Sequence, residues 1–343
     1  MILQFSLLRR RDLKIHNTIL YRVLSKLWRN TYIRAKRNKE ERKYNHYWME
    51  HMETYGNENT DKVFFVIRRR ELYIGLFSYY LTCVDQVAKA IEKGYIPIID
   101  LQNNPNMYLK KEQIGKVNAW EYYFKQPCGY SLSDISHSKS VIWGSGWVED
   151  IFPYNDVAFL LSKNEEINKY KRIAKKYFCL SDEAQNIAKE TTQLLEGKRT
   201  LGVLCRGTDY TSNKPTGHHI QPSVCQMFEK IDGVLAEYSC EQIFLGTEDE
   251  DIYNRFKEKY GERVITNRKK YIEYHGENSI GKLVTNNVVD AYQEGMDYLV
   301  TIVTLSKCNC FVGGHTSGTV GVILMNEKFD YQYIFDLGLY GES

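Results

Sequence analysis

Apolar runs of strand length alternate with stretches of helical periodicity over most of the chain. Residues 63–67 and 95–100 are apolar runs of the length expected for buried strands. Between them, residues 75–91 place apolar side chains on one helical face, and Gly94 offers the backbone freedom that commonly ends a helix. Parallel strands need a long crossover, usually a helix, so this segment predicts a βαβ unit.

The second half of the chain repeats this alternation more regularly. Strands are predicted at residues 200–205, 242–245, 263–266 and 310–313, and helices at residues 221–237, 249–260 and 290–305. Between the two halves, a short strand is expected within 138–147, helices at 164–179 and 181–195, and a helix with a core-facing aromatic side at 118–124. Such alternation is typical of doubly wound parallel sheets. We therefore expect an α/β protein with two such halves and a ligand cleft between them.

Polar residues and glycines follow three strands of the second half. They are Arg206, Gly207, Thr208 and Asp209 after the first strand, Gly246, Thr247, Glu248 and Asp249 after the second, and Gly313, Gly314, His315, Thr316 and Ser317 after the last. Because the carboxyl ends of parallel strands lie at one edge of a sheet, we expect the three clusters to face one crevice. The charged, planar guanidinium of Arg206 suits a phosphate group. Hydroxyls and glycines that precede an apolar helix are typical of an anion-binding cradle.

Composition places the chain among ordinary globular proteins. It has 343 residues, of which 43% are hydrophobic and 26% charged, and it contains no apolar run of membrane-spanning length. The short apolar start is followed by Arg9, Arg10 and Arg11, which is the reverse of the order in a signal peptide. The eight cysteines show no CxxC spacing, so reduced thiols are expected. These features predict a cytoplasmic protein.

The positive charge is concentrated at the start of the chain. Residues 1–45 hold 13 Lys and Arg against three acidic residues, a local charge of +10, whereas the whole chain carries only +3. Within this leader, residues 19–28 place apolar side chains at helical spacing with basic residues between them, as in helices that lie on anionic membrane surfaces. The alternative is that the apolar stripe packs on the protein itself. Nucleic acid is not an expected partner, because no binding motif accompanies the charge.

The three strand-end clusters resemble the motifs of one enzyme family. Residues 204–209 look like the HxRRxD-type first motif of the fucosyltransferase superfamily, which includes nodulation fucosyltransferases, alpha-1,6-fucosyltransferases and protein O-fucosyltransferases. Residues 244–249 resemble the second motif, an apolar strand followed by Thr and paired acids. Residues 305–312, with His315, Thr316 and Ser317 after them, are similar to the third. The resemblance covers roughly residues 198–326.

The resemblance implies an inverting glycosyltransferase that uses GDP-fucose as donor, without a cofactor or an obligatory metal. Its fold would be GT-B-like, with two Rossmann-like, doubly wound domains that face a central cleft. We accordingly expect a basic amphipathic leader at 1–60, an acceptor-side α/β domain at 61–197 and a nucleotide-sugar-binding α/β domain at 198–343. Arg206 occupies the position of the family's essential arginine, which contacts the diphosphate. Thr247, Glu248 and Ser317 fall on donor-binding positions, and Asp209 matches the carboxylate of the first motif.

The chain departs from the family pattern around the first motif. Leu204 replaces the motif's first His and Gly207 its second Arg. A helix position that often carries Asp aligns with Thr301, and Asp297, one turn earlier, is the expected substitute. The other interpretation of Asp297 is an exposed helix carboxylate.

The group that activates the acceptor is not carried over from the family either. In one family member the base is a glutamate shortly after the first motif. Lys214 occupies the corresponding position in this chain. We expect His218 and His219 as substrate-binding residue and catalytic base respectively, because imidazole has a suitable pKa. Hydrogen bonding at the start of the following helix is the alternative role for both.

Three other functions compete with this interpretation. The acidic run 248–251 could hold a divalent ion on the diphosphate, although acids at the start of a helix are also favoured by its dipole. The donor could be another nucleotide sugar. A degenerate transferase fold could act as a membrane-associated binding or scaffold protein.

The preferred acceptor is a glycan or lipid-linked glycan at the inner face of a membrane, as in bacterial polysaccharide biosynthesis.

Overall fold

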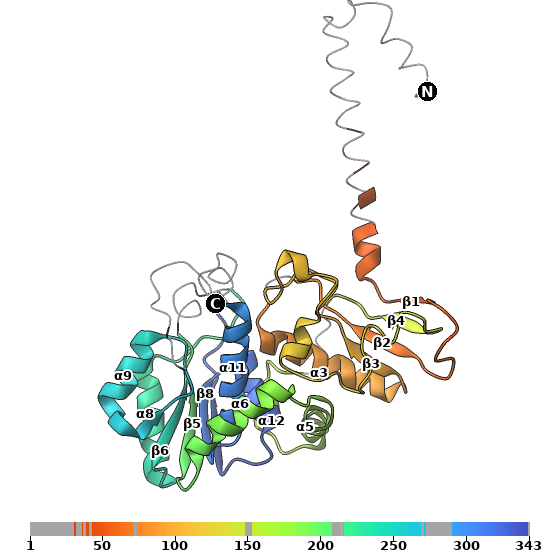
Figure 1. Cartoon of the computed structure of the whole chain (residues 1–343). Coiled ribbons are helices and arrows are strands. Elements are labelled where there is room, and N and C mark those ends of the chain that lie inside the picture. Colours follow the sequence, from red (N-terminus) through yellow and green to blue (C-terminus); the bar gives the residue numbers. More distant parts are fainter. Residues whose placement is uncertain are drawn as a thin grey trace, which may run out of the picture. The chain divides into compact units, whose positions relative to one another are not determined.

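The structure, a computed structural model, describes residues 31, 36, 39–40, 43–71, 74–147, 153–207, 214, 216–268, 271 and 290–341. Contacts divide the chain into two compact units, Met1–Met49 and Glu50–Ser343. In the first unit residues 43–48 are helical, and the amphipathic stripe expected at 19–28 lies outside the described residues. The strands and helices labelled in Figure 1 belong to the second unit. Within the described ranges, no helix is long and apolar enough to cross a membrane.

The first sheet contains four strands in the order β1-β4-β2-β3. They are β1 (His51–Glu53), β2 (Phe64–Ile67), β3 (Ile96–Ile99) and β4 (Val141–Trp143). Strand β2 pairs in parallel with both β3 and β4, whereas the edge strand β1 runs antiparallel to β4. The 17-residue helix α3 (Leu76–Glu92) connects β2 to β3. The predicted βαβ unit and the short strand within 138–147 are therefore confirmed, while β1 was not predicted.

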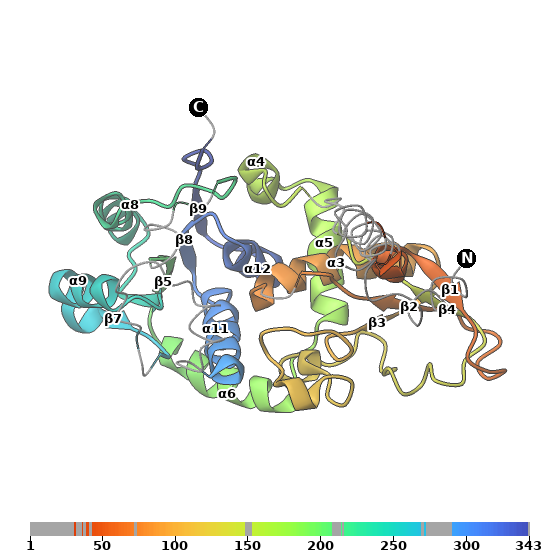
Figure 2. The same ribbon diagram turned by 90° about the horizontal axis from the view of Figure 1, so that it is seen from above.

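The second sheet has five parallel strands in the order β7-β6-β5-β8-β9. Its strands are β5 (Thr200–Leu204), β6 (Gln242–Gly246), β7 (Val264–Ile265), β8 (Cys310–Gly314) and β9 (Tyr331–Phe335). Its helices are α8 (Val224–Glu237), α9 (Glu250–Tyr260), α11 (Ala291–Leu305) and α12 (Ser317–Met325). Figure 2 shows α8 and α9 on one side of the sheet and α11 and α12 on the other. The predicted doubly wound parallel sheet is confirmed, and β9 is an additional strand.

Further helices lie within and between the two sheets. They are the helices α4 (Val157–Leu161), α5 (Glu165–Tyr177) and α6 (Asp182–Thr192), and the 3-10 helices η3 (Lys111–Gln113), η4 (Ala119–Tyr122), η5 (Gln193–Leu195) and η6 (Gly261–Arg263). The helix expected at 118–124 is only the single turn η4, but Trp120, Tyr123 and Phe124 are buried as predicted, and Tyr122 is half-buried. The ring centroids of Trp120 and Phe124 lie 4.6 Å apart in a stacked pair. Ser181 caps α6 by accepting a hydrogen bond from the Ala184 amide.

One buried apolar cluster includes residues of both sheets. It joins Phe65 and Ile67 of β2 to Phe244 of β6 and Phe311 of β8 through helices α3, α11 and α12. The packing between α3 and α12 is close, because a Cβ placed on Gly321 would lie 2.4 Å from the Phe77 ring. The apolar face of α3 is therefore buried partly against α12, which begins at the edge of the second sheet where the three polar clusters are found.

Candidate functional site

The strand order of the second sheet marks one position as a ligand site. From the central strand β5 the chain proceeds to β6 and β7 on one side, and it then crosses to β8 and β9 on the other. In open α/β sheets ligands bind beyond the carboxyl ends of the strands where the order reverses in this way. Here that position lies between the ends of β5 and β8, beside Arg206, Gly207 and the turn from Gly314 into α12.

Arg206 and Glu248, both predicted as site residues, form an ion pair at this edge. The distance between Arg206 Nε and Glu248 Oε1 is 3.2 Å, and the side chains are 14% and 5% exposed. The guanidinium carbon of Arg206 also lies 5.8 Å from the centroid of the Tyr298 ring, within the range of a cation–π contact. Burial strengthens such interactions because little water screens them. Arg206 is thus held in one place at the end of β5.

Gly207 permits a close approach of Asp249 to the backbone. A Cβ at position 207 would lie 2.3 Å from Asp249 Oδ2, so only glycine fits there without a shift. The other carboxylate oxygen of Asp249 caps α9 by accepting a hydrogen bond from the Ile252 amide at 3.1 Å. Thr247 Oγ1 accepts one from the Asp249 amide at 3.2 Å. Thr247 and Asp249 therefore shape the turn that carries Glu248.

The turn from β8 into α12 has the features of an anion site. Thr316 is the N-cap of α12, and its hydroxyl accepts a hydrogen bond from the Thr319 amide at 3.2 Å. Ser317, the first residue of the helix, is half-buried, and no acidic residue occupies the first turn. The first amides of a helix lack partners within the helix, and its dipole favours negative charge at this end. This turn can therefore bind a phosphate group.

His219 and His315 are brought together although 96 positions separate them. Their ring centroids are 3.7 Å apart and the rings are tilted by 34°. His315 is 2% exposed, and its Nε2 lies 2.8 Å from the carbonyl oxygen of Tyr154. His219 Nε2 lies 3.4 Å from Asn155 Oδ1. Among the described residues, the Nδ1 atoms of both rings are buried without a hydrogen-bond partner.

Burial lowers the pKa of both imidazoles. The pKa of His219 falls to about 4 because of burial and, to a lesser extent, the neighbouring His315, while Asp336 opposes the shift. Burial likewise lowers the pKa of His315, against the opposing effect of its contact with the Tyr154 carbonyl. Both rings are therefore neutral near pH 7.

Not all of the predicted site residues gather at this edge. His218 is exposed, and its carbonyl oxygen accepts a hydrogen bond from the Tyr340 amide. The Asp297 carboxylate accepts one from Gln293 Nε2 at 2.8 Å, along the surface of α11, which matches its interpretation as a helix carboxylate. Thr208 and Asp209 lie outside the described residues.

Tyr298, which was not among the predicted site residues, contacts Arg206. Its ring lies under the guanidinium, and its hydroxyl oxygen would be 2.0 Å from a Cβ on Gly318 in the first turn of α12. No local pattern marked Tyr298, because adjacent helical residues point in different directions and the spacing of α11 does not show which of them faces the sheet edge.

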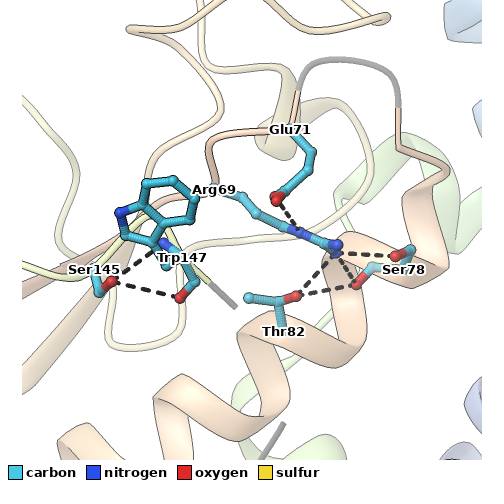
Figure 3. A network of polar contacts seen from close by, with 6 residues as sticks. All are labelled: Arg69, Glu71, Ser78, Thr82, Ser145 and Trp147. Carbon is cyan, nitrogen blue, oxygen red and sulfur yellow. Dashed lines mark hydrogen bonds and ion pairs between the residues drawn. The ribbon is translucent and has the colours of Figure 1, made fainter. Parts of the chain in front are cut away.

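The carboxyl edge of the first sheet carries a second polar network. Figure 3 shows Arg69, just after β2, reaching towards α3. Its Nε donates to Glu71 Oε2 at 3.0 Å, and its Nη1 donates to Ser78 Oγ at 2.9 Å and Thr82 Oγ1 at 3.1 Å. These bonds hold the guanidinium against the first turns of α3.

A small pocket opens beside Arg69, at the ends of β2 and β3. Its lining includes Glu71, Asp100, Asn106 and Tyr108. The Asp100 carboxylate is buried, which raises its pKa, although it accepts hydrogen bonds from the amides of residues 102 and 103. A mixture of amide, carboxylate, guanidinium and phenol groups suits the hydroxyl groups of a polar ligand.

The first two carboxylates of the acidic run 248–251 have different partners. Glu248 is paired with Arg206, and Asp249 caps α9, so the two carboxylates serve separate purposes. In the part of the chain that the structure describes, no three His, Cys, Asp or Glu side chains form a group that could hold a metal ion.

Comparison with known proteins gives matches among solved structures only. No family model and no curated protein matches the chain. NodZ alpha-1,6-fucosyltransferase soaked with GDP-fucose is 14% identical, with a TM-score of 0.47 over 82% of this chain and 98% of that one. Fucosyltransferase NodZ from Bradyrhizobium is 13% identical, with a TM-score of 0.46 over 77% and 94%. POFUT1 in complex with GDP is 13% identical, with a TM-score of 0.42 over 84% and 99%.

These structures include fucosyltransferases, the enzymes whose motifs the strand ends of this chain resemble.

Proposed function

We propose that the protein is a glycosyltransferase that transfers fucose from GDP-fucose to a glycan acceptor. The observation that carries the proposal is the half-buried Arg206, paired with the buried Glu248 at the point where the strand order reverses and beside the N-terminus of α12. A guanidinium and a helix N-terminus at one sheet edge are suited to a nucleoside diphosphate. The resemblance of three motifs to those of fucosyltransferases supports fucose as the sugar.

The proposed reaction inverts the configuration of the transferred sugar. The acceptor hydroxyl attacks the anomeric carbon from the face opposite the diphosphate, the carbon–oxygen bond to the diphosphate breaks, and the electron pair leaves with GDP. Arg206 and the first amides of α12 stabilise the negative charge that develops on the leaving group. Their fixed positions avoid reorganisation during the reaction. This arrangement needs no metal ion to neutralise the diphosphate.

The acceptor proton passes to His219 in this proposal. The lowered pKa keeps its imidazole neutral above about pH 4, and the neutral ring is the form that accepts a proton. The other two proposed catalytic residues are Arg206 and Asp209, which is in the family's carboxylate position. The substrate-binding residues would be Gly207, Thr208, His218, Thr247, Glu248, Asp249, Asp297, His315, Thr316 and Ser317.

We assign the acceptor to the first half of the second unit. In a GT-B-like arrangement, residues 61–197 would face residues 198–343 across a central cleft. The pocket beside Arg69 offers groups that bind sugar hydroxyls. The basic leader would hold the enzyme on the inner face of an anionic membrane, near a lipid-linked glycan acceptor, in the cytoplasm of a bacterium that makes polysaccharides.

A donor screen tests the proposal. Thermal unfolding is measured with GDP, UDP, ADP, GDP-fucose, GDP-mannose and UDP-glucose, and donor hydrolysis is then followed with and without EDTA. We expect the largest stabilisation from GDP and GDP-fucose, and hydrolysis that EDTA does not change. A preference for a uridine or adenine nucleotide would overturn the donor assignment. If GDP-fucose binds but is neither hydrolysed nor transferred to any tested glycan, the protein is a binding module instead.

A further inference from the structure

We propose that Tyr298 is a second diphosphate-binding residue, which orients Arg206 with its ring and reaches the bound anion with its hydroxyl group. The inference rests on one part of the proposed function, namely that a diphosphate binds at this sheet edge. It does not depend on which nucleoside or sugar the diphosphate carries. It rests on four contacts that come from three different elements of the fold.

The first contact is with Arg206. The guanidinium carbon lies 5.8 Å from the centroid of the Tyr298 ring, while Glu248 pairs with Nε at 3.2 Å. A guanidinium with a carboxylate at one edge and an aromatic ring near its face has little freedom to rotate. Its orientation towards an anion is therefore set before the ligand arrives.

The second contact places the Tyr298 hydroxyl at the start of α12. A Cβ on Gly318 would lie 2.0 Å from this oxygen, so the hydroxyl occupies space that a side chain at 318 would need. Gly318 is the second residue of α12, whose first amides point out of the helix. A phosphate group bound by those amides would also be within reach of the phenol, which can donate a hydrogen bond.

The third and fourth contacts hold the Tyr298 ring in place. Phe77 of α3 meets it edge to face, with centroids 5.6 Å apart and an interplanar angle of 90°. The same Phe77 ring packs against Gly321, one turn further along α12. Tyr298 is thus confined between α3, α12 and Arg206. Side chains fixed in this way lose little conformational entropy when a ligand binds.

Two substitutions separate the roles of the ring and the hydroxyl group. Tyr298→Phe keeps the ring under Arg206 and removes the hydroxyl group, whereas Tyr298→Leu removes both. Tyr292→Phe is a matched control, because it removes a hydroxyl group from the same helix, at a position where the ring packs against Tyr122 and Tyr123 instead. Thermal unfolding of each variant checks that the fold is retained.

Calorimetry with inorganic pyrophosphate, GDP and guanosine provides the test. We expect Tyr298→Phe to weaken pyrophosphate and GDP binding about 10-fold, as for the loss of one hydrogen bond to a charged group. Tyr298→Leu should weaken both a further 3-fold or more, through the lost cation–π contact. Guanosine affinity should stay unchanged in both variants, and Tyr292→Phe should bind all three ligands like the unmodified protein.

The possible failures are distinguishable. If the unmodified protein binds GDP and pyrophosphate but both Tyr298 variants bind them equally well, the role of Tyr298 is wrong and the proposed function stands. If pyrophosphate binds and depends on Tyr298 while GDP binds no more tightly than UDP, the donor assignment is wrong and Tyr298 keeps its role. If no diphosphate binds, both proposals are overturned. A loss of guanosine binding in the variants would also contradict a role specific to the diphosphate.

Discussion

The side chains of Arg206 and Glu248 meet across the ends of neighbouring parallel strands, with 3.2 Å between Nε and Oε1. Arg206 follows β5, and Glu248 follows β6 after Thr247, so the pairing of these strands sets the separation of the two charges. Removing one partner of a buried ion pair leaves the other charge without compensation. The substitutions that test this site must therefore keep the positive charge of Arg206.

Arg206→Lys keeps the charge but should abolish measurable transfer. An ammonium group cannot bind two phosphate oxygens through a planar fork, so transition-state stabilisation should fall by roughly 2–4 kcal/mol, as for the loss of comparable oxyanion donors. The measurement is kcat/KM for GDP-fucose hydrolysis or transfer, with circular dichroism to confirm the fold. Activity within a factor of three of the unmodified enzyme would exclude Arg206 from the diphosphate site.

Ser317→Ala should raise the KM for the donor more than it lowers kcat. A hydroxyl group that contacts a phosphate or ribose binds ground state and transition state alike, so its loss mainly weakens substrate binding. Steady-state kinetics with varied GDP-fucose measure this effect. The helix cap belongs to Thr316, so the stability of α12 should not change. An unaltered KM would place Ser317 outside the site.

Gly207→Ala should destabilise the protein by about 1–3 kcal/mol, because the new methyl group would lie against the carboxylate that caps α9. The matched control is Gly233→Ala in α8, where a Cβ meets nothing within 4 Å. There the substitution should stabilise the helix by about 0.5–1 kcal/mol. Urea unfolding measures both changes. Equal effects of the two substitutions would contradict the close approach of Asp249.

Stability should fall as the pH drops from about 6.5 towards 4. The pKa of His219 is lowered to about 4 in the folded protein, whereas a histidine in an unfolded chain titrates near 6.5, so the unfolded state binds more protons in this range. The contribution of the neutral ring is thus fully present above about pH 6.5. Urea unfolding at pH 7, 5.5 and 4.5, repeated with His219→Asn, measures it. The variant should lose less stability on acidification, and an identical pH dependence would show that the ring does not titrate as proposed.

The basic leader should bring the protein to anionic vesicles. Each Lys or Arg near such a surface contributes on the order of 1 kcal/mol, and residues 1–45 carry a charge of +10. Flotation with phosphatidylglycerol vesicles should retain the full chain at low salt and release it at high salt. A variant that begins at Glu50, and so keeps the whole second unit, should stay unbound. Equal partitioning of the two chains would assign the apolar stripe of the leader to the folded protein.

The sequence predicted the strands with continuous apolar runs and missed those without them. β5, β6 and β8 are buried along their whole lengths, and each ends at glycine or polar residues. β9 was not predicted because its first three residues are only half-buried and include Gln332. β1 is a three-residue edge strand, of which two residues are exposed. Neither strand is apolar along its whole length, since edge strands are covered on fewer sides.

Most contacts between positions far apart in the chain could not be predicted from the sequence. The strand pattern did predict that Arg206 and Glu248 lie at one sheet edge, because both follow parallel strands. Nothing in the local pattern indicated that Tyr298 lies under Arg206, or that His219 stacks on His315. Those contacts depend on how α11 and the segment before α8 pack against the sheet, and such packing is decided by side chains far apart in the chain.

The position of β5 in the centre of its sheet has a consequence for synthesis of the protein. β6 follows within about 40 residues, but the opposite edge of β5 pairs with β8, and Thr200 bonds to Asn309, 109 positions later. While the ribosome makes the intervening segment, that edge of an apolar strand has no native partner. Unpaired strand edges invite association between chains. The nascent chain is therefore most vulnerable to aggregation before β8 emerges, and a chain that stops between α9 and α11 should collect in inclusion bodies or on chaperones instead of folding.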